Sequence, residues 1–176
     1  NAKTVIEHYL NSFSHKRAVI TWNPENAPGD EAVKILAAKV CEKNGAPSES
    51  FAITDPIFVS MDFLTANNRL NPVIIVKNSL GTTVFSSANY EEPAWGSMQY
   101  AEGRYRSVCA IPAHILNDGQ YSIELLLVQE TRFVKAQVKS ALEFSVIDNG
   151  ETRGDFLGEW TGVVRPRCVW QTSKIE

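Results

Sequence analysis

The sequence lacks several features that would assign it to a common functional class. No hydrophobic run approaches the roughly 18 to 20 residues of a membrane-spanning helix, and no charged-then-apolar leader opens the chain. Neither the phosphate-binding pattern G-x-x-x-x-G-K-[ST] nor a strand-linked G-x-G-x-x-G occurs. We therefore expect a soluble, unexported chain that hydrolyses no nucleotide by itself.

Basic residues are also too few for a nucleic-acid-binding face. The chain has 17 lysines and arginines against 20 aspartates and glutamates, a formal charge of -3. Binding to a phosphate backbone requires clustered cations that displace counterions. We expect no nucleic acid among the partners.

The residues that usually hold metals or form disulfides are sparse and scattered. There is no H-E-x-x-H and no C-x-x-C, so we expect no metal site and no cofactor. The odd number of widely spaced cysteines favours free thiols in a reducing compartment over a disulfide framework. The three histidines are His8, His15 and His114, and the three cysteines are Cys41, Cys109 and Cys168.

Signatures of catalysis are missing as well. No G-x-S-x-G marks a nucleophilic serine. Paired carboxylates for glycoside hydrolysis meet in space rather than in sequence, and the candidates are Glu91 with Glu92 and Asp155 with Glu159. We interpret both pairs as solvated loop charges and expect no enzymatic activity.

Two segments that open with Gly-x-Tyr are the strongest structural signal that is present. Gly103 to Tyr105 begins an alternating run that ends at Ile111, and Gly119 to Tyr121 begins another. The glycine tolerates a tight corner, the tyrosine enters the core, and alternate residues share one face. We predict two neighbouring strands of an antiparallel sheet.

The rest of the 176-residue chain has the size and pattern of one β domain. An Asn44-Gly45 turn should join its first strand, with a bulge near 36–38, to a returning partner over 48–53. We predict an all-β, antiparallel β-sandwich with a short amphipathic N-terminal helix over 2–13. The domains are 1–29, helix and linker, and 30–176, sandwich. The first strand spans 31–43, and the remaining predicted strands are 57–64, 73–77, 82–87 and 141–147.

Residues 88–103 form the longest irregular segment, and this segment together with the strand that leaves it carries the candidate binding site. Aromatic rings stack on the C–H faces of sugars, and planar guanidinium groups bond their hydroxyls, so the composition indicates carbohydrate binding. The alternatives are that the tryptophan plugs one end of the sandwich and that the arginines form a solvated face or read an anionic sugar or a phosphate. The candidate residues are Tyr90, Trp95, Tyr100, Arg104 and Arg106.

Several segments carry a family resemblance through their order along the chain. They are Asp30 through Asn44-Gly45 to Asp55-Pro56, Gly103-Arg104-Tyr105 to Ile111-Pro112, Ile115 to Tyr121, Leu142 to Val146, and Gly162 to Trp170. In this order they resemble the C-terminal domain of Wzt, the nucleotide-binding subunit of ABC transporters that export O-antigen polysaccharide. The similarity spans about residues 30 to 171, and residues 5–10 are similar to the helix that ends the family's ATPase part.

The resemblance implies a homodimeric carbohydrate-binding module with an immunoglobulin-like or jelly-roll sandwich. It would recognise the non-reducing terminus of a finished O-polysaccharide before export through the membrane subunit Wzm. It implies a cytoplasmic location at the inner face of the inner membrane, within a transporter, and exchange of C-terminal strands such as 162–170 between protomers. A glycan-modifying jelly-roll enzyme and a purely structural dimerisation domain remain the alternatives.

Overall fold

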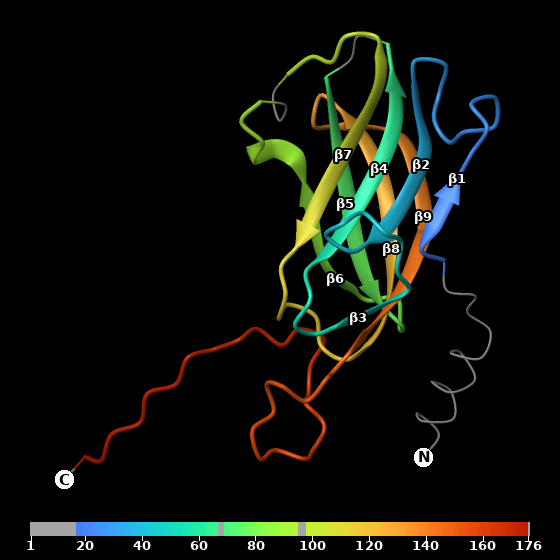
Figure 1. The fold of residues 1–176 in the computed structure, drawn as a ribbon. Helices are drawn as coiled ribbons and strands as arrows, with labels where there is room; N and C mark the ends of the chain where they lie inside the picture. The colour runs from blue at the N-terminus through green and yellow to red at the C-terminus, as the bar shows by residue number, and fades with distance from the viewer. Residues whose placement is uncertain (1–16, 67–68, 95–97, 176) are drawn as a thin grey trace.

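The computed structural model describes residues 17–66, 69–94 and 98–175, which form a β-sandwich (Figure 1). The predicted helix over 2–13 lies outside the described residues. The described part contains nine strands and one 3-10 turn. They are β1 Val19–Thr21, β2 Val33–Cys41, β3 Ser50–Ala52, β4 Ile57–Thr65, β5 Leu70–Asn78, β6 Thr83–Ala88, η1 Asn89–Glu91, β7 Gly103–Ile111, β8 Gly119–Gln129 and β9 Phe133–Ile147.

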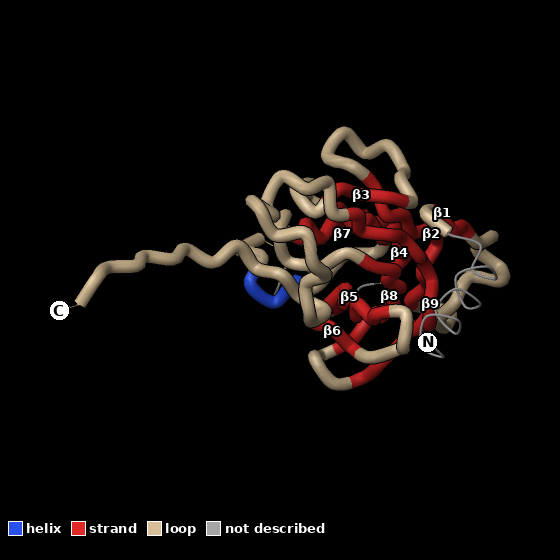
Figure 2. The backbone as a smooth tube through the Cα atoms, turned by 90° about the horizontal axis from the view of Figure 1, so that it is seen from below, coloured by secondary structure: helices blue, strands red, loops and turns tan. Residues whose placement is uncertain are grey.

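The strands form two sheets, as the sequence predicts. The 4-stranded sheet has the order β1-β2-β4-β7 and the 5-stranded sheet the order β3-β9-β8-β5-β6. Seen along the strands, β2, β4 and β7 form one layer and β5, β6 and β8 the other (Figure 2). The all-β sandwich is thus confirmed. Strand β7 is an edge of one sheet and β6 an edge of the other.

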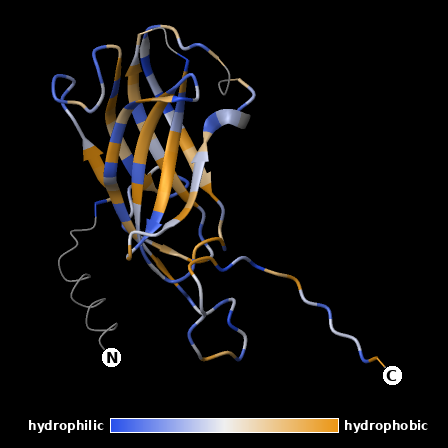
Figure 3. Ribbon diagram, turned by 180° about the vertical axis from the view of Figure 1, so that it is seen from behind, coloured by the Kyte–Doolittle hydropathy of each residue, from blue (hydrophilic) through white to orange (hydrophobic). Residues whose placement is uncertain are grey.

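The core lies between the two inner faces and follows from alternation along the strands. On β4, Val59, Met61 and Phe63 are at most 2% exposed, as predicted for one shared face. Hydrophobic and hydrophilic residues alternate along the strands in Figure 3. Each strand therefore presents one face to the core and the other outward. No helix among the described residues has the length and hydropathy needed to span a membrane.

The two Gly-x-Tyr strands exist, but the prediction that they are neighbours in one sheet is wrong. Strand β7 pairs with β4, and β8 pairs with β5 and β9 in the opposite sheet. The connection 112–118 crosses from one sheet to the other. Alternation gives a strand its inner face but does not specify its sheet, because both sheets bury one face against the same core.

Each Gly-x-Tyr segment is a tyrosine corner. The Tyr105 hydroxyl donates to the carbonyl oxygen of Ala101 at 3.0 Å. The Tyr121 hydroxyl donates to the carbonyl oxygen of Asn117 at 2.8 Å. In both cases the acceptor is four residues earlier, so the ring closes the corner before its own strand. The repeated motif therefore marks where strands begin, one in each sheet.

The Asn44-Gly45 turn forms, but the strand after it does not pair back as predicted. The Gly45 amide donates to the Glu42 carbonyl at 2.9 Å, which closes the turn. Strand β3 then pairs with β9, in parallel, at the edge of the other sheet. The segments on the two sides of the turn pair with each other at an isolated antiparallel bridge between Cys41 and Pro47. The turn is encoded locally, whereas the partner depends on which edge is open nearby.

The segment assigned to a linker from the sequence contains a strand of the sandwich. Residues 19–21 form β1 on the edge of β2, and Trp22 packs against the core. The sequence does not reveal this strand, because only three residues pair before the chain reaches Pro24 and Pro28. Three residues are too few to show the alternation of a strand. The predicted bulge in β2 is present, since its register with β4 shifts between Ile35 and Ala37.

The chain after β9 folds back on the sandwich around one carboxylate. The Asp148 side chain is 2% exposed, accepts from Arg153 Nε at 2.7 Å and also binds Arg165. Leu116 and Val164 form an isolated antiparallel bridge. Residues 148–165 are thereby fixed to the body. Residues 166–175 then extend away from it (Figure 1).

Candidate functional site

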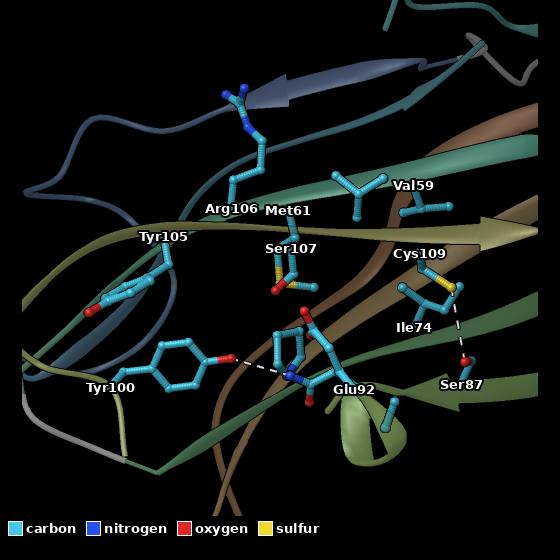
Figure 4. Close-up of a pocket in the computed structure, with 14 residues that line it drawn as sticks. Val59, Met61, Ile74, Ser87, Glu92, Tyr100, Tyr105, Arg106, Ser107 and Cys109 are labelled. Carbon is cyan, nitrogen blue, oxygen red and sulfur yellow. Dashed lines mark hydrogen bonds between the residues drawn. The ribbon is translucent and has the colours of Figure 1, made fainter. Parts of the chain in front are cut away.

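A cavity of about 490 Å³ opens between the two sheets where the edge strands β6 and β7 face each other (Figure 4). Its walls come from four strands, η1 and the segment before β7. The described residues that line it are Val59, Met61, Pro72, Ile74, Ser87, Ala88, Asn89, Glu92, Tyr100, Tyr105, Arg106, Ser107, Val108 and Cys109. The volume is in the range of small-molecule sites.

Short side chains at three inward positions of the edge strands create this space. In the sheet registers, Ser107 lies opposite Met61, Cys109 opposite Val59, and Ser87 opposite Ile74. Directly paired residues of antiparallel strands share a face, so all three short side chains point between the sheets. The sandwich is therefore unfilled at its open edge while its centre is closely packed.

The cavity is apolar at its floor and polar at its rim. Val59, Met61 and Ile74 form the floor and are at most 4% exposed. The Cys109 thiol lies 4.0 Å from the Ser87 hydroxyl across the gap between β7 and β6. Burial raises the pKa of this thiol, so it stays protonated at neutral pH. Polar groups thus surround an apolar base.

Tyr100, predicted as a sugar contact, forms one wall from within the core. It is 3% exposed, and its ring packs edge to face on Phe63 and Tyr105, with centroids 5.7 Å and 4.8 Å away. The hydroxyl accepts from Asn89 Nδ2 at 3.2 Å (Figure 4). Burial raises the pKa of Tyr100. The ring therefore closes one end of the cavity, next to Tyr105.

Arg104 and Arg106 point outward from β7, as the alternation predicts, and both bind Asp62 of β4. Arg106 Nε and Nη2 donate to the Asp62 carboxylate at 2.6 and 2.8 Å, and Arg104 Nη2 donates at 2.8 Å. The hydrogen bonds from Arg106, helped by Arg104, lower the pKa of Asp62 although burial opposes them. Asp62 therefore holds the Arg106 side chain in a fixed orientation on the outer face of the sheet, pointing away from the other lining side chains (Figure 4).

The structure brings together two of the five predicted site residues. Tyr100 and Arg106 line the cavity. Arg104 lies on the outer face beside it, and Tyr90 is 52% exposed on η1 and does not line it. Trp95 lies outside the described residues. Tyr90 and Tyr100 do not form one exposed aromatic surface, since Tyr100 is in the core.

Several lining residues were not predicted from the sequence. Ser87, Ser107 and Cys109 carry a recognisable signal, which is a short side chain at an inward position of a strand. Glu92 is the carboxylate among the described lining residues. No group of three metal-binding side chains occurs in the part of the chain that the structure describes.

The comparisons with known proteins identify the fold and the family. The model of the Wzt C-terminal domain family matches residues 24–165. No curated protein matches the sequence. Among solved structures, the C-terminal domain of Wzt is similar with a TM-score of 0.67 and 13% identity, over 86% of this chain and 91% of that chain. A Niemann-Pick type C2 protein from Japanese carpenter ant gives a TM-score of 0.48 and 15% identity, over 69% and 98%.

At 13% identity the structural likeness establishes the fold alone. The family match adds the relationship, because it covers most of the chain in one continuous stretch. The expected identification is confirmed by both together. The chain belongs to the Wzt C-terminal domain family.

Proposed function

We propose that this chain is a non-catalytic carbohydrate-binding module that recognises the non-reducing terminus of an O-antigen polysaccharide for export. Family membership makes it a domain of an ABC transporter subunit. The cavity between β6 and β7 is the proposed binding site. Its apolar floor and polar rim suit a sugar, which presents both C–H faces and hydroxyls.

The blind form of the cavity is the observation that carries the proposal. Val59, Met61 and Ile74 close its floor, so a polymer inserted from the rim has no exit on the far side. Such a site accepts the end of a chain and excludes its interior. Recognition of a finished end is what a module that licenses export needs.

The rim residues have distinct proposed roles. On the outer face beside the cavity, Arg106 would donate to hydroxyls of a sugar that lies over β7 while Asp62 fixes its orientation, and Arg104 would act through Asp62. Tyr100 would limit the depth of insertion at its end of the cavity. Tyr90 and Trp95, from the segment between β6 and β7, are proposed to contact sugars further along the glycan.

The proposed assembly follows the family resemblance. The module would act as a homodimer at the cytoplasmic face of the inner membrane and reach Wzm through an ATPase domain, with residues 1–29 as the proposed connection. Exchange of the segment 162–170 between protomers is consistent with the Leu116–Val164 bridge and with Trp170, which is 88% exposed.

A matched pair of variants on adjacent residues tests the site. Ser87 faces the cavity beside Ile74, whereas Ser86 faces the opposite side of β6 beside Ile75. We expect Ser87→Leu to fill the cavity and reduce affinity for the source strain's own polysaccharide more than tenfold in calorimetry. Ser86→Leu should bind as the wild type does. Equal affinity of the two variants would move the site elsewhere.

Two further measurements address rim contacts and the alternatives. Arg106→Ala and Trp95→Ala should each weaken polysaccharide binding with the circular-dichroism spectrum unchanged. Mass spectrometry of oligosaccharides incubated with the protein should show no product, because a product would indicate a glycan-modifying enzyme. A dimer in sedimentation that binds no glycan at any concentration would instead indicate a structural dimerisation domain.

A further inference from the structure

The outer face of the 5-stranded sheet carries a stripe of aliphatic side chains. In the sheet register Val73 pairs with Leu126, and Val128 pairs with Val134, so the members of each pair share a face. Leu126 and Val128 point outward, because the leucines that alternate with them along β8 belong to the core between the sheets. Ile75 takes the next outward position of β5 after Val73. We call these residues the outer stripe: Val73, Ile75, Leu126, Val128 and Val134.

The outer stripe is partly exposed and has no cover of matching size. The solvated face of an antiparallel sheet is usually polar, yet Val134 is 52% exposed and Val73 and Ile75 are partly exposed. In the part of the chain that the structure describes, η1 is the one helical element. Its three residues contact β5 but are too few to cover three strands. The stripe is therefore open to another segment.

The sequence before β1 supplies a segment of suitable shape. In a helix over 2–13 the large apolar residues would fall within a sector of about 140°, opposite a side with only polar residues. A helix of this length is marginal in water by itself. It therefore needs an apolar surface against which to form. The apolar residues are Val5, Ile6, Tyr9, Leu10 and Phe13.

The path of the chain brings this segment to the outer stripe. The Arg17 carbonyl accepts from the Glu143 amide of β9 at 3.0 Å, and Glu143 pairs with Ser122 of β8. Along β8, Leu126 and Val128 lie about 13 Å and about 20 Å beyond Ser122. Residues 14–16 can span about 10 Å, and a helix over 2–13 extends about 18 Å further. The segment is thus long enough to run along the whole stripe.

We propose that residues 2–13 form a helix that packs on the outer stripe, antiparallel to β8. Phe13 lies toward Ser122, and Val5 lies toward Val128 and Val134. The helix buries its apolar sector, and the stripe gains the cover that it lacks. The connection 1–29 is then a rigid arm rather than a loose linker, so a domain joined to it is held in a fixed orientation. This inference does not depend on the glycan site.

Hydrogen exchange followed by mass spectrometry on the 176-residue chain tests the docking. The reference is a synthetic peptide of residues 1–16. We expect the amides of 2–13 to exchange at least about 10-fold more slowly in the chain than in the peptide, because only the docked helix protects them.

Two matched pairs of variants locate the contact. Val134→Asp places a charge on the stripe, whereas Val108→Asp places it on the outer face of the other sheet, at similar exposures of 52% and 56%. Leu10→Asp lies in the apolar sector, and Asn11→Asp lies in the same turn on the polar side. Val134→Asp and Leu10→Asp should each reduce the protection of 2–13 at least about 5-fold, because a buried charge disfavours docking. The two controls should keep it.

The amides of β8 report whether the sandwich itself stays folded. If Val134→Asp unfolds it, the comparison of Leu10→Asp with Asn11→Asp decides. The proposal is overturned if 2–13 exchange as fast in the chain as in the peptide, or if each variant behaves like its control. Protection that appears only at concentrations where sedimentation shows a dimer also overturns it, because a second copy would then cover the stripe.

Discussion

Asp148→Asn tests whether one buried carboxylate fixes the segment 148–165 to the sandwich. The substitution keeps the shape of the side chain and an oxygen that can accept from the Gly150 amide, now at 2.9 Å. It removes the negative charge shared by Arg153 and Arg165. The perturbation is therefore electrostatic rather than steric.

The size of the effect follows from the exposure of the three groups. Removing one partner of a fully buried ion pair costs about 3–5 kcal/mol, and the Asp148 side chain is 2% exposed. Arg165 is 11% and Arg153 27% exposed, so water can reach both guanidinium groups after the change. We expect a loss of about 2 kcal/mol, which lowers the melting temperature by about 4–8 °C.

The pH dependence gives an independent check. Burial raises the pKa of Asp148, but hydrogen bonds from Arg165, the Gly150 amide and Arg153 outweigh it, so the pKa lies below its ordinary value of 3.8. A lowered folded-state pKa contributes stability that is complete above the unfolded-state value and is lost as the pH falls through the folded one. The difference between wild type and variant should thus persist at neutral pH and shrink below 3.8.

Urea denaturation at several pH values measures this difference, with Asp30→Asn as the matched control. Asp30 pairs with Lys135 at 2.7 Å, but the two side chains are 43% and 30% exposed, so its loss should cost less than about 1 kcal/mol. If Asp148→Asn costs no more than the control at neutral pH, the carboxylate does not anchor the segment and the reasoning fails.

Other parts of the structure give further predictions. Tyr121→Phe should lower the unfolding free energy measured by urea denaturation by about 1–2 kcal/mol, because the lost hydroxyl lies buried between two carbonyl oxygens. Tyr105→Phe should lower it less, because the Ala101 carbonyl that accepts from Tyr105 is exposed and can bond water instead. Burial raises the pKa of Tyr121 to about 12. The contribution of Tyr121 to stability is therefore complete below the unfolded-state pKa of 10.0 and is lost as the pH rises toward 12, which an unfolding titration at alkaline pH can measure. Gly29→Ala should lower the unfolding free energy by more than about 2 kcal/mol, since φ is +133° and the new Cβ would lie 2.0 Å from a backbone oxygen. In native thiol labelling, exposed Cys168 should react at once and buried Cys41 only on unfolding, as mass spectrometry would show.

Most strands could be predicted from the sequence because the alternation of buried and exposed residues along a strand is a local pattern. On β4, alternation alone identifies Val59, Met61 and Phe63 as inward. The pairing of strands is a different matter, since it depends on contacts far apart in the chain. The Asn44-Gly45 turn correctly predicts a reversal, yet β3 completes the opposite sheet because an edge of β9 lies open there.

The candidate site was only partly accessible to sequence reasoning, for a similar reason. The outward direction of Arg106 follows from alternation, but its pairing with Asp62 requires the β4–β7 register. The position of Tyr100 within the irregular segment 88–103 favours a binding surface, whereas aromatic contacts with Phe63 and Tyr105 bury it. A cavity is a deficit of side-chain volume, which becomes visible only when two sheets are placed face to face.

The position of the cavity on two edge strands bears on how such a domain diversifies. Its shape is set by Ser87, Ser107 and Cys109, which lack neighbouring strands on one side and fill little of the core. Exchanging them reshapes the recess without disturbing the packed centre around β4 and β8. If the proposed glycan site is correct, substitutions at these three positions would therefore change which glycan end fits while leaving the packed centre in place.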